Sequence, residues 1–122
     1  MSALNAAGLD LLLTAGLDAF DKLTLHSDAP GVDGTANVIS AAAVACTWDT
    51  AESDGGTGRQ RPLAAAVEFT GATPTTTVAY IGLWDDTVYL GYITRTTGDA
   101  ATNAAGEYTV TVDTAVKLDM AA

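Results

Sequence analysis

Residues 76–95, TTVAYIGLWDDTVYLGYITR, decide the fold. Side chains alternate with a period of two in residues 76–84 and again in 87–95, and both windows are rich in β-branched and aromatic residues. Asp85 and Asp86 lie between the windows and predict a short turn. The stretch therefore predicts a β-hairpin.

The same alternation recurs before and after the hairpin. After Lys22 it places Leu23 and Leu25 on one face of a strand and Thr24 and His26 on the other. Four further windows show it: residues 44–48 (with Val44, Cys46 and Trp48 on one face), 63–69 (with Leu63, Ala65, Val67 and Phe69 on one face), 107–113 and 114–120. Residues 50–61 and 97–106 are small, polar and glycine-containing, which predicts mobile loops.

One helix is predicted, ahead of all the strands, over roughly residues 4–20. Its apolar stripe has spacings of three and four and consists of Leu9, Leu12, Leu13, Leu17 and Phe20, with Asp10, Asp18 and Asp21 off the stripe. The pattern leaves open whether this helix covers its own sheet or anchors the chain in another protein.

The predicted fold class is mainly β: an antiparallel β-sandwich or partly open barrel of about six or seven strands with one N-terminal α-helix. Because 122 residues suit one hydrophobic core, we expect a single domain over 1–122. Residues 1–21 would form the helix and residues 22–122 the β-sandwich.

Charge and composition exclude several partners. Fifteen acidic residues against five Lys and Arg give a net charge of −10, so the chain lacks the basic surface that nucleic acid or an anionic membrane requires. No signal peptide or membrane span is expected, because no Lys or Arg precedes the first apolar run and Asp10 interrupts it.

The only histidine lies in LTLHSDAPGVDG, residues 23–34. A Ser–His–Asp triad is not expected there, because Ser27 follows His26 directly in an extended strand and points to the opposite face. The hypothesis is a structural corner in which Pro30 and Gly31 turn the chain out of the sheet and the His26 ring bonds a loop carbonyl or Asp28. The corner consists of Leu25, His26, Asp28, Pro30 and Gly31.

No catalytic, cofactor-binding or metal-binding residue is predicted. Cys46 alternates with apolar side chains, which is typical of an inert buried cysteine. The carboxylates at Asp85–Asp86 and at Asp49, Glu52 and Asp54 are oxygen ligands of the kind that Ca²⁺ uses, but their spacing does not match an EF-hand loop. We interpret them as solvated turn residues.

Two arginines and several aromatic side chains are candidates for an interface. Arg59 and Arg61, on an acidic chain, are expected to meet carboxylates within the fold or on another copy. The aromatic residues are expected in the core or at a subunit interface rather than in a sugar-stacking platform. The predicted interface set is Arg59, Arg61, Trp84, Tyr89 and Tyr92.

Taken in order, these features resemble the small proteins of tailed bacteriophages that are labelled phage tail fibre proteins. The resemblance spans Leu9 to Leu118 and is strongest in two pieces, Leu25-His26-Ser27-Asp28-Ala29-Pro30-Gly31 and Ile81-Gly82-Leu83-Trp84-Asp85. The middle departs from the family pattern, because Ala36-Asn37-Val38 stands where that family has Asn-Glu-Val and SAAAVACTW replaces a Gly-Gly-Ser-Tyr-Ala-Arg type of segment.

The resemblance implies a non-enzymatic structural protein of the virion, made in the host cytoplasm and assembled as a minor tail or tail-fibre component. The expected partners are further copies of the chain, as a homotrimer by analogy with other phage appendages, other virion proteins of tail or capsid, and a glycan of the host surface. The alternative is a decoration protein on the major capsid lattice. A remote alternative from another class is a carbohydrate-binding module.

Overall fold

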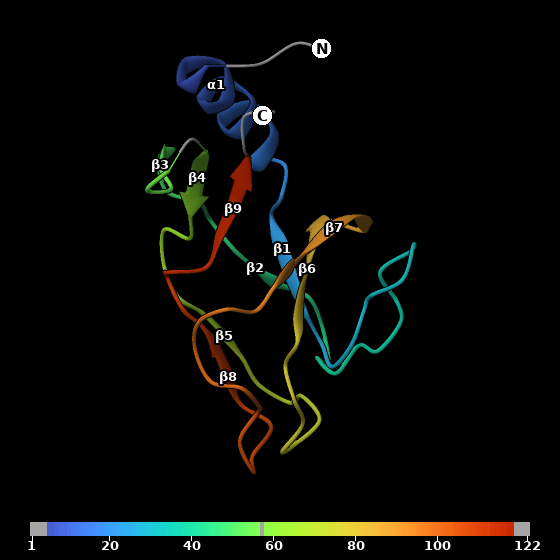
Figure 1. Ribbon diagram of the computed structural model, residues 1–122. Helices are drawn as coiled ribbons and strands as arrows, with labels where there is room; N and C mark the ends of the chain where they lie inside the picture. The colour runs from blue at the N-terminus through green and yellow to red at the C-terminus, as the bar shows by residue number, and fades with distance from the viewer. Residues whose placement is uncertain (1–4, 57, 119–122) are drawn as a thin grey trace.

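The computed structural model describes residues 5–56 and 58–118, and it confirms the predicted fold class. The protein is mainly β, with one helix and three antiparallel sheets that do not close into a barrel within the described residues (Figure 1). Nine strands form there, more than the six or seven predicted.

The elements follow one another along the chain with short connections. They are α1 (Ala6–Leu17), β1 (Lys22–His26), β2 (Val44–Ala45), β3 (Glu52–Ser53), β4 (Arg59–Pro62), β5 (Val67–Phe69), β6 (Tyr80–Asp85), β7 (Val88–Thr94), β8 (Tyr108–Val110) and β9 (Ala115–Leu118). The sheets have the strand orders β2-β1-β6-β7, β3-β4-β9 and β5-β8.

The hairpin predicted from residues 76–95 is β6–β7. Asp85 pairs with Val88, so the two-residue turn consists of Asp86 and Thr87, one residue later than expected. Asp86 has φ 50°, the left-handed conformation that such tight hairpin turns need. A bulge lies between Leu83 and Trp84, where Leu83 pairs with Gly91 and Trp84 with Tyr89.

Two parts of the strand prediction were wrong. The expected loop 50–61 contains the β3–β4 pair, in which Glu52 lies opposite Gln60. The expected strand 63–69 is interrupted, because residues 64–66 form an exposed bend between β4 and β5 and Ala65 is exposed rather than inward. Residues 64–66 are all alanine, and their small side chains pack too weakly to hold that stretch in a sheet.

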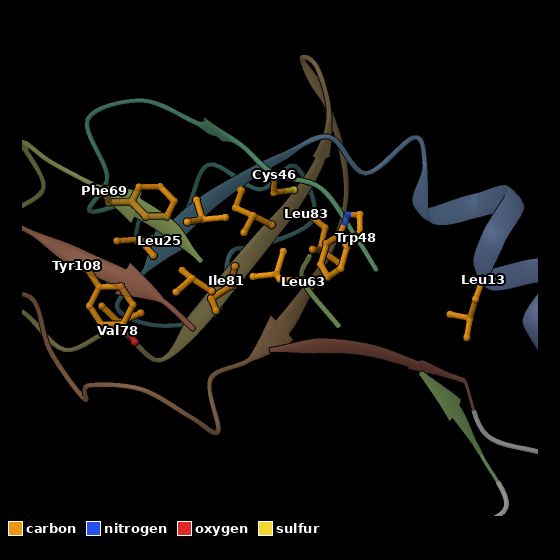
Figure 2. Packing of buried hydrophobic residues seen from close by; sticks show 13 residues of the cluster. Leu13, Leu25, Cys46, Trp48, Leu63, Phe69, Val78, Ile81, Leu83 and Tyr108 are labelled. Carbon is orange, nitrogen blue, oxygen red and sulfur yellow. The ribbon is translucent and has the colours of Figure 1, made fainter. Parts of the chain in front are cut away.

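The core contains the predicted inward faces of several strands. Leu23 and Leu25 of β1 are completely buried, and so are Ile81 and Val78 near β6. Figure 2 shows the cluster extending from Phe69 and Tyr108 towards Trp48 and Leu63, with Leu13 on α1 at the far end. Val44, Cys46 and Trp48 do share an inward face, although only Val44 and Ala45 form a regular strand there.

α1 lies at one end of the molecule, packs mainly against β4 and begins at Asn5, whose side chain caps the Gly8 amide at 2.9 Å (Figure 1). Leu9 and Leu13 are buried as predicted, but Leu12 is 54% exposed. The side chain of Leu17, and residues 119–120 of the predicted last strand, lie outside the described part of the chain. Leu12 faces outward because the helix turns its Asp10 side to the arginines of β4.

Candidate functional site

His26 is the centre of a buried polar cluster on β1. It is 0% exposed, and its two ring nitrogens each have one partner. Nδ1 lies 2.9 Å from the carbonyl oxygen of Ala36 in the β1–β2 connection, and Nε2 lies 2.7 Å from Oγ1 of Thr24. A loop carbonyl was one of the two partners expected for this ring.

The partners fix the tautomer of His26. A carbonyl oxygen only accepts, so Nδ1 carries the proton and donates to Ala36, and Nε2 accepts from the hydroxyl of Thr24. The Oγ1 of Thr24 in turn accepts from Nε1–H of Trp84 at 2.9 Å. The relay therefore runs from Trp84 through Thr24 and His26 to Ala36, with every group paired and the imidazole neutral.

Burial favours this neutral form. It lowers the pKa of His26 below its ordinary value of 6.5, against a smaller opposing effect of the hydrogen bond to Ala36. In the neutral form the Thr24 hydroxyl donates to Nε2 and accepts from Trp84, so each of its contacts is a hydrogen bond. The cluster thus joins β1, β6 and the β1–β2 connection through neutral hydrogen bonds.

Gly82 of β6 makes room for this relay. It pairs with Thr24 across the β1–β6 ladder, beneath the polar side chains. A Cβ at this position would lie 2.8 Å from Nε2 of His26 and 3.1 Å from Nε1 of Trp84, and it would also clash with Oγ1 of Thr24. Only glycine therefore fits under the cluster.

The other residues of the predicted corner set the path of the β1–β2 connection and do not bond the ring of His26. Pro30 is fully buried, its carbonyl accepts from the amide of Ala36 at 3.0 Å, and Gly31 has φ 77°. Asp28 is exposed and accepts from the Ala29 amide at 2.8 Å, so it is not the partner of His26. Pro30 and Gly31 thus fold the connection back until Ala36 reaches the imidazole.

The aromatic candidates form two edge-to-face pairs on the same sheet. Trp84 packs on Tyr89 with ring centroids 5.2 Å apart, and Tyr80 packs on Tyr92 at 5.1 Å. Gly34 of the β1–β2 connection lies against the first pair, since a Cβ there would be 2.8 Å from Cζ2 of Trp84. Trp84 and Tyr89 are therefore partly covered by the chain itself, whereas Tyr92 is 54% exposed.

Arg59 and Arg61 both find their partners within the chain. Arg59 binds Asp10 of α1 through two hydrogen bonds, Nε–Oδ1 at 2.6 Å and Nη2–Oδ2 at 3.0 Å. This bidentate pair holds the middle of α1 on β4.

Arg61 is only 7% exposed and binds the end of α1. Its Nη1 donates to the carbonyls of Leu13 and Thr14 and to Asp18 at 3.1 Å, and its other nitrogens donate to the carbonyls of Asp49 and Trp48. A cation at the last carbonyls of a helix also meets the negative end of its dipole. This guanidinium is thus enclosed within the fold, in the position of a clamp between α1 and β4.

The other chemically active groups are dispersed. Cys46 is buried with its Sγ 3.3 Å from the carbonyl of Phe20, and burial raises its pKa to about 11, which keeps the thiol protonated. Asp49 and Asp54 accept from nearby loop amides, and Asp86 pairs with Lys22 at 2.7 Å. In residues 5–56 and 58–118, no three His, Cys, Asp or Glu side chains are grouped so as to hold a metal ion.

Sequence reasoning missed Thr24, Gly82 and Ala36 as members of the histidine cluster. The alternation does place Thr24 beside His26 on one face, and that spacing was a usable signal. The sequence gives no such signal for Gly82 or Ala36. Gly82 joins the cluster through a strand pairing across 58 residues, and Ala36 joins it through the path of a loop.

No family model, no curated protein and no solved structure matches this chain. Among the described residues, no helix has the length and apolar character needed to cross a membrane.

Proposed function

We propose that the protein is a non-enzymatic structural component of a tailed-phage virion, of the minor tail or tail-fibre type, made in the host cytoplasm and incorporated into the particle. The observation that carries the proposal is a contrast within the described chain. Its polar clusters tie segments of the fold together, while large apolar side chains are exposed on two elements.

Most of the exposed large apolar residues gather on α1 and β7, while Val32, Val38 and Val112 are exposed singly elsewhere. Leu11 and Leu12 are exposed on α1, and Val88, Leu90 and Tyr92 are exposed on β7, one of the two edge strands of the four-stranded sheet. Exposed apolar surface on a helix and along a sheet edge is typical of chains that pack against neighbours. It supports an assembly subunit better than a chain that acts alone.

The chemistry of the clusters supports the same class of function. The His26 relay ends at the indole of Trp84 and the carbonyl of Ala36, neither of which is a nucleophile or a proton acceptor for a substrate. Arg59 and Arg61 are engaged with Asp10 and Asp18 rather than directed at an anion outside the chain. These contacts join segments of the fold, as a structural component requires.

The resemblance to phage tail fibre proteins is the reason for proposing a phage particle as the assembly. Its two strongest pieces, residues 25–31 and 81–85, are the corner and the strand that the structure brings together through His26, Thr24 and Trp84. A motif pair that meets in one cluster is a coherent structural unit. The tail is favoured over the capsid by that resemblance.

Immunogold electron microscopy of the intact phage tests the location. A peptide tag in the exposed loop around Gly55 should place gold on the tail, and the untagged phage is the matched control. Label distributed over the capsid would instead indicate the decoration protein, and purified particles that contain no tagged protein would contradict a virion role. In that last case glycan binding through the exposed Tyr92 becomes the competing hypothesis.

A further inference from the structure

Residues 27–37 of the β1–β2 connection, which we call the lid, lie against the four-stranded sheet on the face turned away from the core. The lid is closed at its base by a hydrogen bond from the Ser27 amide to the Asn37 carbonyl at 3.0 Å. Apart from Ser27, Pro30 and Gly34, its residues are exposed. A segment with so few buried side chains belongs to the least stable part of a fold, which opens while the core stays intact.

Two contacts attach the lid to the sheet. The carbonyl oxygen of Ala36 accepts from Nδ1 of His26 at 2.9 Å. Gly34 lies against the rings of Trp84 and Tyr89, where a Cβ would clash with both. Within the described part of the chain, the bond from His26 is the one hydrogen bond that joins residues 28–36 to a strand. Opening the lid therefore breaks one hydrogen bond and uncovers two aromatic rings.

The hydroxyl group of Tyr89 opposes closure of the lid. Its oxygen is buried and makes no hydrogen bond to any described residue, and burial raises the pKa of this phenol above its ordinary value of 10. A hydroxyl that loses its hydrogen bonds to water without gaining others destabilises the state that buries it. Because Gly34 of the lid lies on the same ring, the closed state carries this cost.

The histidine favours closure only while it is neutral. Burial lowers the pKa of His26 below its ordinary value of 6.5, and a charged ring is stable only where water reaches it. The ring bonds Thr24 and Ala36, both uncharged. Among the described residues, the charged and titratable side chains on the elements around the ring make no bond to it; they are Lys22 on β1, Asp28 and Asp33 on the lid, Tyr80 on β6, and Tyr89 and Tyr92 on β7.

We infer that the lid is a pH-sensitive device, which neutral His26 holds closed over Trp84 and Tyr89 and which protonation of the ring opens. The step adds one proton to Nε2 and breaks no covalent bond. In the open state the two uncovered rings extend the aromatic surface of Tyr80 and Tyr92, which pack edge to face on the same sheet. The lid operates in the isolated chain and does not depend on the virion role.

Hydrogen exchange of the two indole N–H groups, followed by NMR on the full chain, tests this device. Nε1–H of Trp84 donates to Thr24 beside the lid. Nε1–H of Trp48 donates to the carbonyl of Phe20 at 2.7 Å and is the internal control. Between pH 7.5 and 5.5 the protection factor of Trp84, corrected for the intrinsic exchange rate at each pH, should fall by up to about tenfold, because a ring with its ordinary pKa is about tenfold more often charged than neutral at pH 5.5. The protection factor of Trp48 should not change.

Two phenylalanine variants give a readout of the opposite sign. Tyr89→Phe removes the unpaired hydroxyl, so it should favour the closed lid and raise the protection factor of the Trp84 indole about tenfold at pH 7.5. Tyr92→Phe, on a ring that is 54% exposed, is the matched control and should leave that factor unchanged. A protection factor of Trp84 that is independent of pH, an equal loss at both indoles, or a Tyr89→Phe variant no better protected than Tyr92→Phe would each overturn the inference.

Discussion

The ring Nδ1 of His26 lies 2.9 Å from the carbonyl oxygen of Ala36, ten residues further along the chain. Together with the backbone hydrogen bonds from Ser27 to Asn37 and from Ile39 to Leu25, this contact holds the β1–β2 connection against the sheet, where Gly34 covers Trp84 and Tyr89. Because the imidazole is fully buried and paired at both nitrogens, the corner depends on a neutral histidine. Its consequences can be measured without any assay of activity.

Replacement of this histidine should destabilise the fold. His26→Ala leaves a cavity and removes the partners of Thr24 and Ala36, so the free energy of unfolding should fall by about 3 kcal/mol. Urea denaturation followed by tryptophan fluorescence measures the loss. Asp28→Ala, which changes an exposed neighbour, is the control and should shift it by no more than about 0.5 kcal/mol. Equal effects of the two substitutions would contradict the cluster.

Stability should depend on pH through His26. Burial lowers its pKa in the folded protein below the ordinary value of 6.5, so the unfolded chain binds more protons between the two values. The stabilising contribution of neutral His26 is then complete above pH 6.5 and is lost as the pH falls from 6.5 through the lower, folded pKa. Urea midpoints between pH 7.5 and about 5, above the ordinary range of carboxylates, measure this loss.

His26→Ala provides the control for that pH dependence, because the chain has no other histidine. The groups that bond the ring, Thr24 and Ala36, are uncharged, so the pH dependence of stability does not arise from a partner that titrates with the ring. In the variant the midpoint should be nearly flat over the same range. A slope that persists without His26 would assign the effect to other groups.

Gly82 should not tolerate even a methyl group. Gly82→Ala places a Cβ 2.8 Å from Nε2 of His26, and relieving that contact should cost about 2 kcal/mol. Gly16→Ala is a matched control, because the Cβ there would meet nothing within 4 Å and alanine favours the helix by about 1 kcal/mol. Thermal melting should therefore show opposite shifts of the two midpoints. A neutral Gly82→Ala would contradict the close packing of the relay.

The two arginines of β4 should differ in their contribution. Arg61→Ala removes a buried guanidinium that binds α1 and the segment before β3, and should reduce the free energy of unfolding by about 3 kcal/mol. Arg59→Ala breaks a more exposed pair and should cost clearly less. Denaturation curves of both variants measure stability. Limited proteolysis in the connection that follows Asp18 measures the release of α1. Equal losses, or a protected α1 in Arg61→Ala, would argue against the clamp.

The β6–β7 hairpin and the inward leucines of β1 could be predicted from the sequence because both depend on local alternation. Period-two patterning places Leu23 and Leu25 inward whatever their partners are. The predicted turn, Asp85 and Asp86, is one residue too early, because the turn consists of Asp86 and Thr87. A short acidic turn does not by itself specify the register of the strands. Local chemistry was sufficient for these elements.

The orientation of α1 could not be predicted in the same way. Its stripe of spacings includes Leu12, but the helix is rotated so that Asp10 meets Arg59, a pairing across 49 residues. Thr24 and Gly82 form one cluster for a similar reason, because a strand ladder brings them together. Contacts between distant segments decide such details, and the periodicity of one segment carries no record of them.

The central claim is that the protein is a tail component of a phage particle. Quantitative mass spectrometry of purified tails and capsids, scaled to the major capsid protein, tests it most directly. The account predicts about three to a few tens of copies per particle, confined to the tail fraction, as symmetric appendages require. Hundreds of copies in the capsid fraction, or none in either fraction, would contradict it.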